Sequence, residues 1–279
     1  MKKKKTFFIQ QFDTVHCCAG GGVSYDADAQ AYFDAVPTPF NAARKEIINT
    51  LVLDLKASGD WSNLDRLWLL SNSAIGNSLI SLVNPASPPM LNVGGMDWDI
   101  DEGFKSFNVP FAYLNTNTGL DSFTHYSQDS AMVYSYQRSV NTTTQTFGGV
   151  QDLGSVYGNY FSIDAGGTLT IHVNELYDFS VTLPGFGDTK AGLGYVRTAE
   201  FTVDCYRNGV IVGSPAAGQS FALVDKPMFI GGINSNGVLS SEDQEEQIYS
   251  VFAIGSKLVN QLTLHNSIQA YMTSLGFQN

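Results

Sequence analysis

The stretch that decides the fold reads Phe201-Thr202-Val203-Asp204-Cys205-Tyr206-Arg207-Asn208-Gly209-Val210-Ile211-Val212-Gly213. Two runs rich in β-branched and aromatic residues flank Asn208-Gly209, a pair that readily adopts the positive φ angles of a tight type I′ turn. The stretch therefore predicts a β-hairpin. Further strands are expected at 227–232 and 248–254. Regular strands and turns between 170 and 254, with almost no helix among them, are typical of a β-sandwich.

The composition agrees with a large, mainly β chain. Hydrophobic residues make up 43% of the 279 residues and charged residues only 15%, while Gly (27), Phe (18) and Tyr (13) are plentiful. This mixture suits a turn-rich sandwich whose exposed positions are polar but uncharged. The length allows one large sandwich with a smaller appendage, or two domains.

The charge balance excludes some partners. A formal net charge of −11 argues against nucleic-acid binding, because phosphates would be repelled. Lys2 to Lys5 form a basic tip, which is either simply solvated or in contact with an acidic partner. The apolar run Phe7-Phe8-Ile9 that follows is too short for a signal peptide. Since no apolar run approaches the ~20 residues that cross a membrane, we expect a soluble protein made in a cytoplasm, with no membrane span.

The three cysteines do not form a disulfide framework. Cys17 and Cys18 are adjacent and Cys205 is remote, and no Cys-x-x-Cys spacing exists. Cys17, Cys18 and His16 together offer soft-metal ligands, but no further ligand lies near them in the sequence. We therefore favour three free thiols in a reducing compartment.

The chain divides into an N-terminal attachment arm (1–25), a helical module (26–63) and a sandwich (64–279). Asp26 or Asp28 can cap a helix that runs through Phe33. Gly59 is placed to end a second helix. In that helix the apolar stripe is expected to contain Phe40, Ala43, Ile47, Ile48, Leu51 and Leu55, and the opposite face Arg44, Lys45, Glu46 and Lys56.

Within the sandwich, a proline-rich connection at 81–90 precedes the strands. A polar loop is expected at 141–146, and a closing helix at 257–275 should pack back onto the sandwich. Gly276 is placed to end that helix. Its apolar stripe is expected to contain Leu258, Leu262, His265, Ile268, Met272 and Leu275. Strands are expected at 91–93, 103–108, 112–114, 131–139, 160–163 and 168–173, after a first strand or hinge at 69–70.

The order of these segments resembles a family of bacteriophage virion proteins with a concanavalin-like (laminin-G-like) jelly roll. Residues 26–33 resemble the family's opening helix, and 48–56 with Trp61 and Leu64 its second helix and exit. The sandwich positions that carry the likeness are 101–104, 112–116, 206–209, 229–231 and 252–256. The likeness covers roughly 26–279; residues 1–25 lie outside it, and the sequence between Gly103 and Ala112 departs from it.

The resemblance implies a structural protein of a tailed phage, placed on a head fibre, tail fibre or baseplate. Its N-terminal region would attach to other virion proteins, and its jelly roll would meet a host-surface glycan or a neighbouring virion protein. We also expect a homo-oligomer, because the apolar stripe from Phe40 to Leu55 exceeds what one sandwich can cover, and a trimer is favoured because fibres are often trimers. The resemblance implies assembly into the virion in the bacterial cytoplasm. The resemblance carries over no catalytic, cofactor-binding or metal-binding residue, and no cofactor is expected.

Asp97-Trp98-Asp99-Ile100-Asp101-Glu102 is the strongest candidate for chemistry. On a strand, Asp97, Asp99 and Asp101 would share one face. Alternating acids of this kind serve jelly-roll glycosidases, but those sites generally use Glu at the two working positions. The spacing also imitates the start of a calcium loop, yet Glu102 stands where that loop needs Gly and Asn108 where it needs Glu. A solvated acidic turn is favoured over both.

The other polar and aromatic residues give weaker signals. His16, His125, His172 and His265 are scattered, and His265 lies on the inner stripe of the closing helix, where a packing role is expected. Sugar-stacking aromatics are an alternative to cross-strand packing at Trp98, Tyr126, Tyr134, Tyr136, Tyr157 and Tyr160.

The sequence therefore predicts a mainly β jelly roll that is not an enzyme and that displays a lectin-like surface. The alternative is a virion polysaccharide depolymerase that uses the acids at 97–102. A third possibility is a purely architectural decoration protein.

Overall fold

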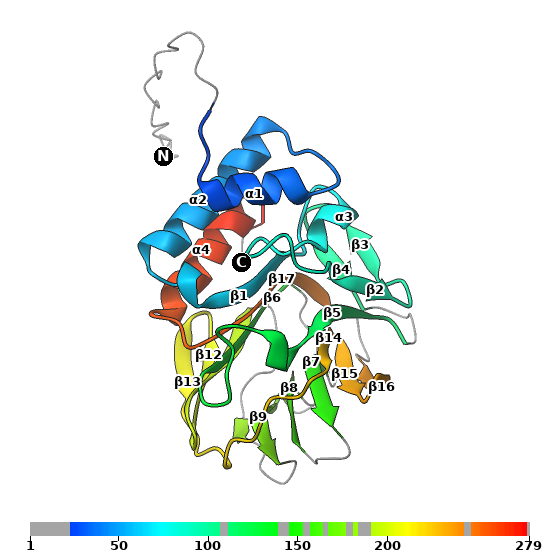
Figure 1. Cartoon of the computed structure of the whole chain (residues 1–279), viewed down its shortest axis with the longest axis vertical. Coiled ribbons are helices and arrows are strands. Elements are labelled where there is room, and N and C mark those ends of the chain that lie inside the picture. The colour runs from blue at the N-terminus through cyan, green and yellow to red at the C-terminus, as the bar shows by residue number, and fades with distance from the viewer. Residues whose placement is uncertain are drawn as a thin grey trace, which may run out of the picture.

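The chain folds into two stacked β-sheets with a layer of helices over one of them (Figure 1). This computed structural model describes residues 23–106, 111–138, 145–152, 157–163, 167–176, 181–183, 191–242 and 247–277. The predictions for Lys2 to Lys5, for Cys17 and Cys18, and for nearly all of the arm at 1–25 lie outside the described residues. The architecture is a jelly-roll-like β-sandwich, mainly β as predicted.

The first sheet has the strand order β13-β12-β11-β6-β17-β4-β3, and β1 pairs with β17 beyond the two residues that pair with β4. Its strands are β1 (Leu64–Leu69), β3 (Asp97–Asp99), β4 (Gly103–Lys105), β6 (Ala131–Gln137), β11 (Gly192–Ala199), β12 (Thr202–Arg207), β13 (Val210–Gly213) and β17 (Ile248–Gly255).

The second sheet has the order β10-β9-β8-β7-β14-β5-β2, and β15 joins β7 and β16. Its strands are β2 (Leu91–Val93), β5 (Tyr113–Gly119), β7 (Gln145–Asp152), β8 (Tyr157–Ile163), β9 (Leu169–Leu176), β10 (Val181–Leu183), β14 (Pro227–Ile230), β15 (Gly232–Ser235) and β16 (Val238–Glu242).

The predicted hairpin is confirmed. Strands β12 and β13 are antiparallel neighbours, and Asn208 (φ 52°) and Gly209 (φ 75°) both take the positive φ that a type I′ turn requires. The tip also leaves no room for a side chain at Gly209, since a Cβ there would lie 2.5 Å from the Cα of Leu262. The hairpin tip therefore packs directly on the start of the C-terminal helix.

The central strands of the first sheet are buried on both faces, which explains why they show no polar alternation. In β6, Ala131 and Val133 enter the core between the sheets, whereas Met132, Tyr134 and Tyr136 enter a second core under the helices. A strand covered on both sides reads as a continuous apolar run. The helices over β1, β6 and β17 are visible at the top of Figure 1.

The helices are α1 (Ala27–Ala35), α2 (Ala42–Ala57), the short α3 (Ile75–Ser78) and α4 (Gln261–Ser274). Asp26 caps α1, its side chain accepting a hydrogen bond from the N–H of Asp28 at 2.9 Å. Gly276, with φ 95°, follows the end of α4 as predicted. None of the helices in the described part of the chain has the length and hydrophobicity that a membrane span requires.

Two helical faces differ from the sequence prediction. Arg44 was expected on the polar face of α2, but it is only 8% exposed, and Ala43 of the expected apolar stripe faces solvent. On α4, Leu262 is 42% exposed, and the buried face instead includes Gln261, Leu264 and Tyr271. On each helix one polar side chain, Arg44 or Gln261, is buried, and one residue of the expected apolar stripe is exposed.

The polar segment at 141–146 was expected to be a loop, and the structure corrects this at its end. Gln145 and Thr146 are buried residues of β7, paired with Ile163 and Ser162 of β8. This strand was missed because Gly148 and Gly149 interrupt it, although Thr146, Phe147 and Val150 are residue types that favour strands.

Candidate functional site

The acids at 97–102 do not form the single acidic face that the sequence suggested. Asp97 and Asp99 lie on β3, but Asp101 lies in the β3–β4 turn with φ 63°. Asp99 is ion-paired with Lys105, which also lies 3.5 Å from Glu102. Asp101 is ion-paired with the buried Arg44 of α2. The strand ends before Asp101, so its carboxylate is directed to the helical layer.

These ion pairs give the acidic turn a structural role. The Arg44 guanidinium also lies 3.4 Å from the hydroxyl of Tyr271. The same hydroxyl donates to the backbone oxygen of Ser71 at 2.6 Å. The pair therefore ties α2 and α4 to the edge of the first sheet. Among the residues that the structure describes, no three His, Cys, Asp or Glu side chains gather as a metal site.

Most of the tyrosines considered as sugar contacts are buried packing residues. Tyr126 donates to the Oδ1 of Asn159 at 2.8 Å, and Tyr136 donates to the Oε1 of Gln269 at 2.7 Å. Trp98 is half-buried and donates to the backbone oxygen of Leu70 at 3.0 Å. Burial removes the faces of Tyr126 and Tyr136 from any ligand. For these two residues the favoured packing role is confirmed, and the alternative of a sugar contact is wrong.

The two buried histidines are also packing groups. His265 lies under the helices with its Nδ1 2.9 Å from the hydroxyl of Tyr134, as expected for a stripe residue. His172 stacks on Tyr160 with ring centroids 4.2 Å apart. Burial lowers the pKa of His265 and lowers the pKa of His172 to about 4, so both rings are neutral at pH 7.

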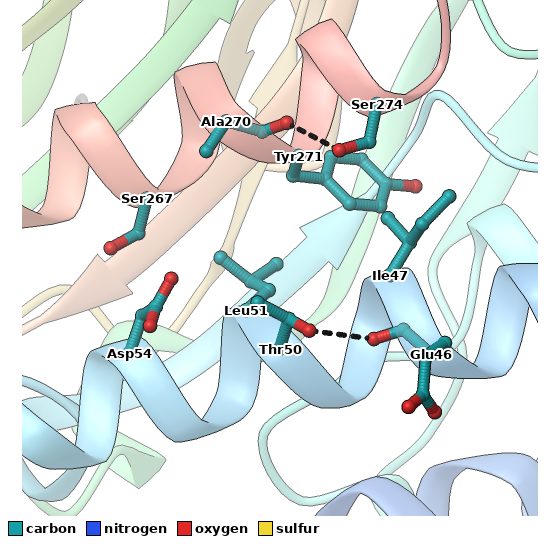
Figure 2. Close-up of a pocket in the computed structure, with 9 residues that line it drawn as sticks. All are labelled: Glu46, Ile47, Thr50, Leu51, Asp54, Ser267, Ala270, Tyr271 and Ser274. Atoms are coloured by element: carbon teal, nitrogen blue, oxygen red, sulfur yellow. Dashed lines mark hydrogen bonds between the residues drawn. The ribbon is translucent and has the colours of Figure 1, made fainter. Parts of the chain in front are cut away.

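A first groove lies between α2 and α4, with a volume of about 160 Å³ (Figure 2). Leu51 and Tyr271 extend into it from the two helices. The hydroxyls of Thr50 and Ser274 already donate to carbonyls of their own helices, at 2.9 Å each. The groove exists because α4 presents small side chains to α2, and its hydroxyl groups are largely satisfied within the helices.

A second groove, which we call the hairpin groove, lies where the β12–β13 hairpin meets the start of α4. It has a volume of about 270 Å³. Its residues are Val196, Tyr206, Gly209 and Ile211 from the first sheet and Lys257, Leu258, Val259, Asn260 and Gln261 from the segment that opens α4.

Two polar residues distinguish the hairpin groove. Gln261 is only 7% exposed, and its Nε2 has no hydrogen-bond partner among the described residues. Tyr206 is half-buried, and burial, with the nearby carboxylate of Asp204, raises its pKa, so its hydroxyl stays protonated. A buried amide donor without a partner costs free energy, and such groups are uncommon in folded proteins.

Little in the sequence indicates this groove. The hairpin motif predicts no role of its own for Tyr206, and Gln261 is predicted only as one residue of the closing helix at 257–275. Tyr206 and Gln261 come together because the closing helix packs back onto the sandwich, as the sequence predicts. Their exact placement depends on how the hairpin tip fits against Leu262, which the sequence does not reveal.

No protein-family model and no curated protein matches this sequence. Among solved structures, the fold is similar to receptor-binding domains of botulinum neurotoxins. A type C structure, whose title describes cell entry dependent on two ganglioside molecules, has a TM-score of 0.54 at 11% identity and covers 76% of this chain and 53% of that one. The serotype D binding domain gives 0.53 at 11% identity over 75% of this chain and 52% of that one. This chain thus spans about half of each neighbour, and the likeness establishes a shared β-sandwich fold.

Proposed function

We propose that this chain is a non-enzymatic, carbohydrate-binding β-sandwich carried on the virion of a tailed bacteriophage, as a head fibre, tail fibre or baseplate appendage. The observation that supports carbohydrate binding is the fold shared with a receptor-binding domain whose title names gangliosides, which are glycolipids. The partner is a host-surface glycan. The phage assignment rests on the family resemblance of residues 26–279.

The non-enzymatic part of the proposal is supported by the arrangement of the acids. A glycosidase places two carboxyl groups on either side of the scissile bond, about 5–9.5 Å apart, facing one substrate. Here Asp99 is turned to Lys105, and Asp101 is turned to Arg44. Asp99 and Asp101 are thus each committed to a cation of their own chain rather than to a shared substrate position.

Assembly is proposed from the resemblance alone. The N-terminal region attaches to other virion proteins, and the chain forms a homo-oligomer, with a trimer favoured. An uncovered stripe from Phe40 to Leu55 was the reason offered for oligomerisation, and that reason is wrong because Phe40, Leu51 and Leu55 are buried within one chain. Light scattering should give three times the 30.3 kDa of one chain. A monomer at high concentration would rule the trimer out.

The function is tested with a glycan array and a depolymerisation assay run on the same protein. We expect reproducible binding to at least one glycan and no release of reducing ends from host polysaccharide. Asp99→Asn should leave glycan binding unchanged. Reducing ends released by the unaltered chain and lost in Asp99→Asn would establish a depolymerase instead. A blank array from a protein that still binds phage particles would establish an architectural decoration protein.

A further inference from the structure

We propose that Asn236, at the tip of the β15–β16 hairpin, is a site of spontaneous deamidation to aspartate and isoaspartate, and that Asn208 in the equivalent β12–β13 turn is protected. The inference stands apart from the proposed function, since the reaction needs no partner other than water. The two turns share their sequence and their backbone conformation, so the contacts around each one decide the outcome.

The two turns are closely matched. Asparagine is followed by glycine at 208–209 and 236–237 and nowhere else in the sequence, and valine comes next in both cases. Each pair forms the two-residue turn of an antiparallel hairpin, and the hairpins lie on different sheets (Figure 1). Asn236 (φ 53°) and Gly237 (φ 91°) take the positive φ angles that Asn208 (φ 52°) and Gly209 (φ 75°) take. Both asparagines are exposed, so water reaches both.

The reaction joins the side chain of an asparagine to the backbone nitrogen of the residue that follows it. Hydroxide removes the proton from the glycine nitrogen, which attacks the asparagine Cγ. The N–Cγ bond forms, the Cγ–Nδ2 bond breaks and ammonia leaves, which gives a five-membered succinimide. Water then opens the ring at either carbonyl, giving aspartate or isoaspartate. Glycine favours the attack because it has no Cβ to hinder the approach. Ring closure requires rotation about the Cα–C bond of the asparagine, so the turn must first open locally.

The surroundings of Asn208 oppose this opening. Its Oδ1 accepts a hydrogen bond from the N–H of Gly192 at 2.9 Å, and its own N–H donates to the backbone oxygen of Gly192 at 2.7 Å. Gly209 packs on α4 so closely that a Cβ there would lie 2.5 Å from the Cα of Leu262. Closing the ring at Asn208 would therefore break the side-chain hydrogen bond and move Gly209 against the helix.

Asn236 has room to react. A Cβ added at Gly237 would meet no atom within 4 Å, so the backbone there can turn without displacing a neighbour. The movement is opposed by a hydrogen bond from the N–H of Gly237 to the Oδ1 of Asn234, at 2.6 Å. One ordinary hydrogen bond shifts an equilibrium by roughly five- to tenfold, so it slows the opening without preventing it.

The test is peptide mapping by mass spectrometry after incubation of the full chain at mildly alkaline pH, once folded and once in concentrated guanidinium chloride. In the folded chain Asn236 should deamidate at least about tenfold faster than Asn208, which must also give up its side-chain hydrogen bond. In the unfolded chain the two sites should react at nearly equal rates. A protein isoaspartate methyltransferase should label the peptide that contains residue 236. Asn236→Gly keeps a residue that tolerates positive φ and should remove both signals.

The product should loosen one hairpin and leave the other unchanged. Isoaspartate adds an atom to the main chain of the turn, so amide hydrogen exchange should become faster in β15 and β16 but not in β12 and β13. Equal rates at Asn208 and Asn236 in the folded chain would overturn the inference. So would a difference that persists in guanidinium chloride, because the sequence rather than the fold would then set it. An Asn236 that stays intact in the folded chain would show that the bond to Asn234 is enough to keep the turn closed, and would also overturn the inference.

Discussion

Replacing Arg197 with alanine should lower the free energy of unfolding by about 3–5 kcal/mol, the usual cost of breaking a buried ion pair. Arg197 and Glu175 are both fully buried, and the Nη2 of Arg197 lies 3.3 Å from the Oε2 of Glu175. The Arg197 Nε also donates to the backbone oxygen of Val173 at 2.8 Å. Alanine would leave the Glu175 carboxylate without its cation in the core between the sheets.

The pair matters beyond its own two residues because it fastens a long connection to the end of the sandwich. The Oε2 of Glu175 accepts from the backbone N–H of Gly218 at 2.7 Å, and the Nη1 of Arg197 donates to the backbone oxygens of Gly218 and Glu200. Burial raises the pKa of Glu175 and lowers the pKa of Arg197, and each partner offsets the cost of burying the other. Losing one partner therefore loosens the connection around Gly218.

Urea denaturation of four proteins would measure the effect: the wild type, Arg197→Ala, Glu175→Leu and the double variant. The double variant should recover much of the loss, because replacing both charges with apolar groups is often close to neutral. Arg207→Ala changes a half-buried arginine of the neighbouring strand and serves as the comparison. A loss below about 1 kcal/mol in Arg197→Ala would mean that the pair is hydrated rather than buried.

Local signals in the sequence were enough to predict much of the fold. Asn208-Gly209 specifies its turn through the φ angles of two adjacent residues, and Gly276 ends its helix in the same local way. The sandwich class follows from the repetition of such signals. Strand β17 was predicted at 248–254 and is found at Ile248–Gly255, because its apolar run is bounded by polar residues and turns.

Contacts between distant residues were not predictable in the same way. An arginine on a helix is usually exposed to solvent. Nothing near Arg44 in the sequence reveals that Asp101 lies where the two can form an ion pair. The prediction that Asp97, Asp99 and Asp101 share one face assumed that the strand continues to Asp101. The strand ends at Asp99, and the turn that follows directs Asp101 elsewhere. The hairpin groove depends on two segments that meet only in the folded chain. These failures share one cause: the deciding partner is far away in the sequence.

Replacing Asp65 with alanine should lower the free energy of unfolding by about 2–4 kcal/mol, because it leaves several backbone donors without their acceptor. Asp65 is 5% exposed on β1. Its Oδ1 accepts from the N–H of Thr124 at 2.7 Å, and its Oδ2 accepts from the N–H of Tyr126 at 2.7 Å. The N–H of His125 contacts both oxygens, at 2.9 and 3.1 Å. One carboxylate thus holds three successive amides of the segment that leads into β6.

Asp65→Asn is the sharper variant because it keeps the shape and replaces one acceptor oxygen with a donor that faces another donor. It should cost nearly as much as alanine. Amide hydrogen exchange at residues 124–126 should become faster in both variants, while Asp121→Ala, an exposed acid of the adjoining turn, should leave it unchanged. The hydroxyl of Tyr126 donates to Asn159 on β8 of the second sheet. Loosening the amides at 124–126 should therefore also speed amide hydrogen exchange in β8. If residues 124–126 of Asp65→Ala were as well protected from exchange as those of the wild type, the prediction would be contradicted. Water would then replace the carboxylate at little cost, and the packing of Phe123 and Tyr126 would hold the segment instead.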